Sequence, residues 1–214
     1  MTTSVLSVLE RDTIVRRGRR LSFATLFFNS LEGVVAIVAG LSAGSVALVG
    51  FGVDSGIELA ASAVALWRLG ADAAPARRAR AERIGHRVIG LLFVALALYI
   101  AYDAGSSLVR REAPSASLLG IGLAIASLVV MPYLARAKRR VGSALDSRAL
   151  IAESAQTSLC SYLAAILLGG LLLNALLGWW WADPVAALMM VPIIAREGIG
   201  GLRGTPPCVD DCRS

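Results

Sequence analysis

Two carboxylates one helical turn apart lie in a stretch of the chain that is otherwise apolar. Asp54 and Glu58 fall within the apolar run 46–69. In an α-helix, residues four apart lie on the same face, about 6 Å apart along the axis. A charged side chain near the centre of a bilayer costs about 2.5–3.5 kcal/mol, so acids inside a membrane span mark functional sites. The pair therefore predicts a site for protons or for a cation.

Other polar residues are expected at the same depth as this pair. Counted from the same membrane face, Glu32, Glu58 and Cys160 each lie 11 residues into their apolar runs, and Gln156 lies 7 residues in. Glu153 lies about one turn nearer to that face, and its spacing places it on one helix face with Gln156 and Cys160. These positions predict a polar layer near the middle of the bilayer.

The acids of this layer are expected to lack basic partners, because no Lys, Arg or His falls at their depth. The only histidine, His86, lies in a basic connection. Three unpaired charges there would cost about 10 kcal/mol, which is comparable with the stability of a whole domain. The acids must then be protonated, hydrated or neutralised by a cation. Alternation between protons and a divalent metal would be an exchange mechanism, and oxygen ligands with one thiolate suit Zn²⁺ or a neighbouring transition ion.

The pattern of apolar runs predicts an all-α, polytopic membrane protein. The chain has 214 residues, of which 57% are hydrophobic. Six runs are near the roughly 20 residues that a helix needs to cross a bilayer, and strand-like alternation is absent. The runs are 21–41, 46–69, 88–109, 117–135, 149–173 and 179–195. Because no nucleophile–base arrangement or phosphate-binding loop is found, we do not expect an enzyme.

The basic residues predict the orientation of the chain in the membrane. Of the 21 Lys and Arg residues, all but Arg110 and Arg111 lie at the N-terminus or after the second, fourth and sixth runs; Lys138 is placed in the connection after the fourth run. The positive-inside rule then puts both termini in the cytoplasm of a bacterial inner (plasma) membrane. The charge is expected to attract anionic lipid headgroups. It does not form a patch typical of nucleic-acid binding.

Smaller signals concern helix packing and helix ends. Gly33, Gly40, Gly52 and Gly56 predict close approach between helices. Asp183, which is followed by proline, predicts the start of the last helix and serves there as the expected N-cap.

Three stretches follow the motifs of a known family. Residues 47–62 correspond to the pattern A-L-x-A-D-x-x-H-x-x-x-D-x-x-S-S, with Asp54 in place of its His and Glu58 in place of its second Asp. Residues 149–160 correspond to A-L-x-A-D-x-x-H-x-x-x-D, with Glu153 in place of its first Asp, and residues 181–188 resemble a sixth-span start. With these motifs, six spans and short outer connections, the chain resembles the cation diffusion facilitator (cation efflux) family. The likeness is to a short branch without the cytoplasmic C-terminal domain.

The resemblance implies a transporter that exports a divalent metal in exchange for protons. Zn²⁺ is the expected substrate, with Cd²⁺, Mn²⁺, Fe²⁺ and Co²⁺ as others, and a homodimer is expected by analogy. The implied metal ligands are Asp54, Glu58, Glu153, Cys160, Gln156 and Glu32. Gln156 and Cys160 stand where the family has His and Asp, so Glu153 or Glu32 is expected to supply an oxygen in their place. Gln156 as a hydrogen bond between helices and Cys160 as a packing residue are the alternatives.

The expected organisation is a basic cytoplasmic segment at 1–20, the six-span domain at 21–200 and a cytoplasmic tail at 201–214. The tail carries Cys208 and Cys212, either as incidental thiols or as a pair that captures a soft metal. Two other functions stay open. One is a membrane protein that binds metal and regulates a partner without transport, and the other is a transporter of an organic cation.

Overall fold

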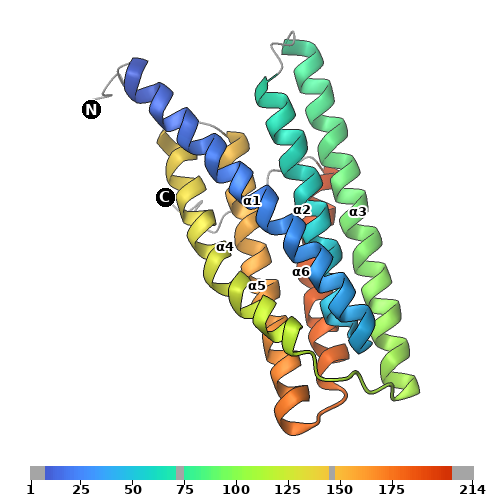
Figure 1. Ribbon diagram of the computed structural model, residues 1–214. Helices are drawn as coiled ribbons and strands as arrows, with labels where there is room; N and C mark the ends of the chain where they lie inside the picture. The colour runs from blue at the N-terminus through green and yellow to red at the C-terminus, as the bar shows by residue number, and fades with distance from the viewer. Residues whose placement is uncertain (1–7, 71–74, 145–147, 204–214) are drawn as a thin grey trace, which may run out of the picture.

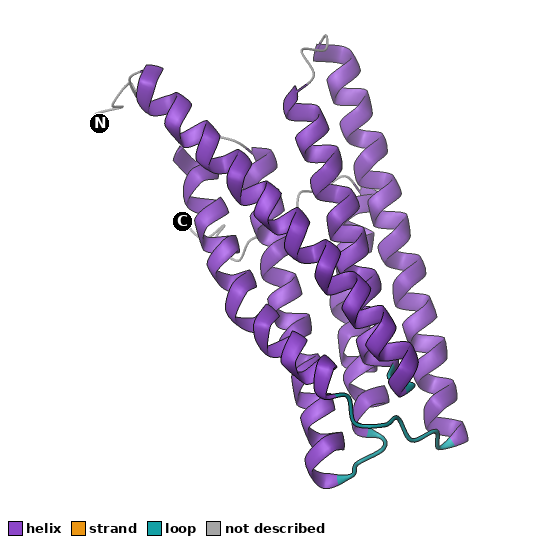
Figure 2. Ribbon diagram, viewed as in Figure 1, coloured by secondary structure: helices purple, strands orange, loops and turns teal. Residues whose placement is uncertain are grey.

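The computed structural model describes residues 8–70, 75–144 and 148–203, which form six α-helices with no strand among them (Figures 1 and 2). The helices are α1 (Val8–Ala43), α2 (Val46–Gly70), α3 (Pro75–Arg110), α4 (Leu118–Ala144), α5 (Arg148–Leu177) and α6 (Ala182–Arg203). Each coincides with one predicted apolar run, so the all-α six-helix fold is confirmed. Several helices continue well beyond the apolar run that predicts them, and this changes the position of two charged residues, as described below.

The bundle has an apolar exterior and a partly polar interior. Over the described residues, five helices are long and apolar enough to cross a membrane, namely all except α2. α2 has 25 residues and packs against α1, α3, α5 and α6. On α1, Phe27 is 75% exposed whereas Asn29 and Glu32 are buried. This is the reverse of a water-soluble protein, and it is the arrangement expected of a polytopic membrane protein.

The helices form three extensive pairs. α1 lies along α2, α4 along α5, and α3 along α6, while α2 also contacts α5 and α6. α1 crosses the bundle at a slant, and the first described residues of α1 and the last of α6 lie toward the same end (Figure 1). The connections 44–45, 111–117 and 178–181 lie at the other end (Figure 2). α2 therefore holds its two acids where four other helices approach it.

A tight turn joins α1 to α2. Gly44 has a φ of 68°, the left-handed conformation that glycine adopts easily. The N–H of Ser45 donates to the carbonyl of Gly40 (3.0 Å), as in a Schellman C-cap. The hydroxyl of Ser45 then accepts a hydrogen bond from the N–H of Leu48 (3.1 Å), which caps the start of α2.

Asp183 reinforces this turn from another helix. Its carboxylate accepts hydrogen bonds from the Ser45 hydroxyl (2.5 Å) and the N–H of Ala47 (3.4 Å). α6 already begins at Ala182, so the expected N-cap role of Asp183 in its own helix is wrong. The side chain caps α2 instead, and it ties the beginning of α6 to the α1–α2 turn.

Three of the four predicted packing glycines lie at a close contact between α1 and α2. A methyl group at Gly52 would lie 2.9 Å from the backbone N of Ile37, and one at Gly40 would lie 2.8 Å from the N of Val49. A methyl group at Gly33 would lie 3.3 Å from the carbonyl of Gly52. Gly56 faces open space, so the packing role expected for it is wrong.

We expect Gly52→Ala to lower the free energy of unfolding by about 1–3 kcal/mol, because the added methyl group meets backbone that must shift. The measurement is thermal or denaturant unfolding of the protein in detergent micelles. Gly56→Ala is the matched control, one turn along the same helix, and it should be neutral or slightly stabilising. Equal effects of the two substitutions would contradict the close contact.

Candidate functional site

Asp54 and Glu58 line a small buried cavity together with residues from three other helices, α3, α5 and α6. Gln156 of α5 and Glu197 of α6 contribute its remaining polar groups. The apolar part of its wall is formed by Phe93, Leu159, Leu163, Ile193 and Ile194. The cavity volume is about 10 Å³, which is close to the space that one water molecule requires. The site can therefore accommodate a single water molecule or small ion among several oxygen atoms.

The polar atoms at this cavity are incompletely bonded. Glu58 accepts a hydrogen bond from the Thr157 hydroxyl on Oε1 (2.8 Å), but its Oε2 has no partner, and neither has Nε2 of Gln156. The Asp54 side chain is also buried, and the charged groups around it are all acids. Buried polar atoms without partners are rare in proteins and point to a missing proton, water or ion.

Glu197 is a third acid at the cavity, and the sequence reasoning above missed it. The predicted sixth run ends at residue 195, whereas α6 continues to Arg203 and carries Glu197 into the bundle. Helical spacing does contain the signal, because Glu197 follows the buried Met190 and Ile194 by seven and three residues. Glu58, Glu32 and Glu197 are the charged neighbours of Asp54.

The prediction that the acids lack basic partners is wrong for Glu153. Lys138 is fully buried, and its Nζ lies 2.9 Å from Oε1 of Glu153 in an ion pair. The fourth apolar run ends near residue 135, but α4 extends to Ala144, so Lys138 lies inside the bundle and not in a connection. The Ser22 and Ser62 hydroxyls also donate to Glu153 (both 3.2 Å). The Glu153 carboxylate is thereby neutralised within the protein.

A hydrogen-bonded chain links this ion pair to Glu58. Lys138 donates to the Thr157 hydroxyl (3.2 Å), and the same hydroxyl has two acceptors within reach. These are Oε1 of Glu58 (2.8 Å) and the backbone carbonyl of Glu153 (3.0 Å). Lys138 thus places its positive charge one hydroxyl group away from the carboxylate of Glu58.

Glu32 occupies a separate polar junction of four helices. Its carboxylate accepts hydrogen bonds from the Ser55 hydroxyl of α2 (3.0 Å), from the Ser127 hydroxyl of α4 and from the Cys160 thiol of α5 (3.8 Å). All four side chains are buried. Asn29, one turn before Glu32, is also buried; its amide lies near the Glu58 carboxylate without meeting hydrogen-bond geometry in the described structure.

The structure divides the six predicted ligands among three places. Asp54, Glu58 and Gln156 share the cavity, Glu32 and Cys160 contact each other, and Glu153 pairs with Lys138. Across the described ranges, no three His, Cys, Asp or Glu side chains are close enough to hold a metal together. The tail cysteines, 208 and 212, lie outside the described residues.

We expect Lys138→Met to lower the free energy of unfolding by about 3–5 kcal/mol, because it leaves the buried Glu153 without its counter-ion. The double variant Lys138→Met with Glu153→Gln should recover much of this loss. Unfolding in detergent, analysed as a double-mutant cycle, measures the coupling. Arg136→Met is the control, since Arg136 is exposed on the same helix. Additive effects of the two single substitutions would contradict the pair.

Comparison with known proteins agrees with this architecture. Residues 22–203 match the family model of the cation efflux transmembrane domain. An uncharacterized transporter of Synechocystis sp. is 31% identical over 151 residues, which cover 68% of this chain and 49% of that protein. An uncharacterized transporter of Methanocaldococcus jannaschii is 28% identical over 176 residues, which cover 78% and 61%. The uncharacterized transporter YdbO of Bacillus subtilis is 24% identical over 194 residues, which cover 88% and 67%.

The chain spans about half the length of the Synechocystis protein and about three fifths of the M. jannaschii protein. The family match extends from the middle of α1 to the end of α6, and so includes the cavity and both neighbouring polar clusters. This chain therefore belongs to the cation efflux family.

Proposed function

We propose that this chain carries a divalent metal cation across the membrane in exchange for protons, with Zn²⁺ or a similar transition ion as substrate and export from the cytoplasm as direction. One observation carries the proposal. Asp54, Glu58 and Glu197 meet at one buried cavity whose lining contains no basic residue. A membrane protein must neutralise such a group of acids with protons or with a cation.

The chemistry of these side chains supports exchange between the two. Carboxylates bind a divalent ion only after they release their protons, so binding of the ion and binding of protons compete. An ion that leaves the cavity is then replaced by protons, which keep the acids neutral inside the bilayer. Because the two compete at Asp54 and Glu58, the metal ion and the protons would cross the membrane in opposite directions.

The size of the cavity supports a single inorganic ion as the substrate. A volume of about 10 Å³ leaves no room for an organic cation. The proposed ligands are Asp54, Glu58 and Glu197, with the amide oxygen of Gln156 as a fourth. Because no three acids are close enough to bind a metal together, the ion would draw these side chains inward as it binds.

The other predicted ligands have different proposed roles. Glu153 already has Lys138 as its counter-ion, so we propose that it holds that lysine near Thr157. We propose that Glu32 and Cys160 supply hydrogen-bond donors and acceptors beside the cavity, since Glu32 is a charged neighbour of Asp54.

We expect Asp54→Asn and Glu58→Gln each to reduce metal transport by roughly 10–100-fold or more, because each removes a charged ligand. Uptake of Zn²⁺, Cd²⁺ and Mn²⁺ into proteoliposomes that contain the purified protein measures this. Glu112→Gln is the matched control, because Glu112 lies in an exposed connection outside the cavity, where its carboxylate pairs with Arg110 (3.6 Å) and accepts a hydrogen bond from the Ser107 hydroxyl (3.4 Å).

Transport by both site variants at the parent rate would show that the site is wrong. Binding of metal by the parent protein without any flux would favour a regulatory membrane protein. Inhibition by an organic cation that is itself transported would favour the third alternative.

We expect the apparent affinity for the metal to fall as the pH falls, because protons compete for the same carboxylates. The logarithm of the dissociation constant should change by about one per pH unit for each proton displaced, and Glu58→Gln should reduce the slope by about one. Titration calorimetry in two buffers with different ionisation enthalpies counts the protons directly. An affinity independent of pH would exclude exchange at this site.

A further inference from the structure

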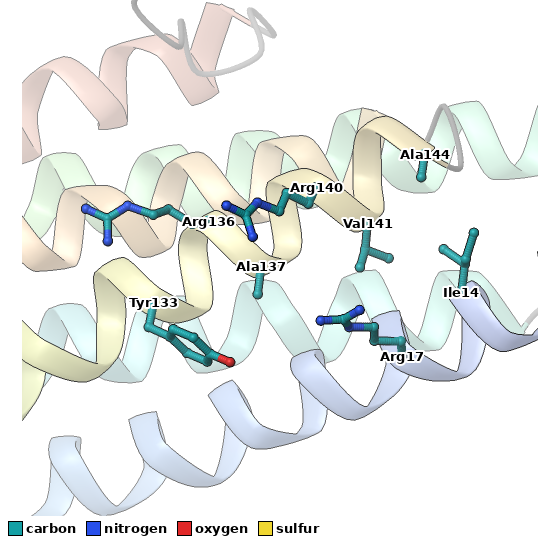
Figure 3. A pocket seen from close by; sticks show the side chains of 8 residues that line it. All are labelled: Ile14, Arg17, Tyr133, Arg136, Ala137, Arg140, Val141 and Ala144. Carbon is teal, nitrogen blue, oxygen red and sulfur yellow. The ribbon is translucent and has the colours of Figure 1, made fainter.

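A second pocket of the described structure lies away from the acidic cavity, between α1 and α4. It has a volume of about 520 Å³, which is within the usual range for ligand sites. Its lining residues are Ile14, Arg17, Tyr133, Arg136, Ala137, Arg140, Val141 and Ala144. Figure 3 shows Ile14 and Arg17 on α1 and the other labelled side chains on α4.

The pocket is lined by positively charged side chains and by no acidic side chain. The charged residues are Arg17, Arg136 and Arg140. All three are exposed, and none makes an ion pair or a hydrogen bond with a described residue. Three exposed guanidinium groups around one pocket give it a positive potential, which favours an anion there. Arginine binds phosphate groups with paired hydrogen bonds, so phosphate is the anion that fits best.

The position of the pocket favours a phosphate that belongs to a lipid. The candidate membrane span of α1 begins at Arg16, and that of α4 ends at Ala144. The pocket therefore lies at the level where the apolar spans end and lipid headgroups begin. Ile14, Ala137 and Val141 give it an apolar wall beside the arginines. Tyr133 lies about two turns toward the bilayer from Arg140, and tyrosine is typical of the membrane interface.

We infer that this pocket binds the headgroup of an anionic phospholipid, with its phosphate between Arg17 and Arg140 and its glycerol and upper acyl chain against the apolar wall. The bound lipid joins α1 to α4 at this end of the bundle. This link supports the interior, since Ser22 of α1 donates to Glu153 and Lys138 of α4 pairs with the same carboxylate. The inference is independent of metal transport.

The test compares lipid binding by the full chain and by a charge-reduced variant. Native mass spectrometry of the detergent-solubilised protein would measure retention of dioleoylphosphatidylglycerol against dioleoylphosphatidylcholine. We expect the parent to prefer the anionic lipid by roughly tenfold or more, and Arg17→Gln with Arg140→Gln to lose most of this preference. The matched control is Arg87→Gln with Arg203→Gln, which removes two exposed charges outside the pocket and should keep the preference.

A second variant keeps every charge and blocks the space. Ala144→Trp, at the exposed rim of the pocket, should also lose the preference. An equal loss in the control pair would overturn the inference in favour of diffuse surface charge. Saturation by inorganic phosphate alone, with no added preference for the lipid, would overturn it in favour of a site for free phosphate. Unchanged preference in both pocket variants would overturn it as well.

Discussion

An acid buried in this bundle must be neutralised or hydrogen-bonded, because the surrounding lipid offers neither water nor counter-ions. The buried acids meet this constraint to different degrees. Glu153 has a lysine, and Glu32 has three donors from three other helices. Glu58 has the Thr157 hydroxyl and, behind it, Lys138, whereas the charged neighbours of Asp54 are all acids. Glu153 and Glu32 stabilise the bundle as it stands, whereas no described basic side chain lines the cavity that holds the other two acids. This contrast, more than the presence of acids as such, is our reason for proposing the cavity as the site of function.

Close packing of α1 on α2 and the cap supplied by Asp183 hold the acidic helix in place. Glycine at positions 40 and 52 lets the two backbones approach without side chains between them, and a carboxylate from α6 satisfies the free N–H groups at the start of α2. α2 is thereby fixed at one end and along one side. Its other neighbours, α5 and α6, supply Gln156 and Glu197 to the cavity, so the geometry of the site depends on how those two helices sit against a fixed α2.

Hydropathy and spacing were sufficient to predict the six helices, the polar layer and the shared position of Asp54, Glu58 and Gln156. They were insufficient for Lys138 and Glu197, because a run of apolar residues marks the part of a helix that meets lipid and not where the helix ends. Once α4 and α6 extend beyond their apolar runs, rotation about the helix axis decides which side chains point inward. Lys138 follows Ser127, Met131 and Leu134 on the buried face of α4, a periodicity visible in the sequence. Its pairing with Glu153 was not visible in the sequence, since contacts between helices depend on the tertiary arrangement.

The Thr157 hydroxyl has one hydrogen and two acceptors, the Glu58 carboxylate and the backbone carbonyl of Glu153. It can satisfy only one of them at a time. Under the proposed exchange, the hydrogen lies on Glu58 while that carboxylate is ionised and empty, and it turns to the carbonyl one turn back along α5 once a proton or a cation occupies the carboxylate. A single bond rotation in the middle of the bundle would then link the state of the cavity to Glu153, the residue that pairs with α4 from α5.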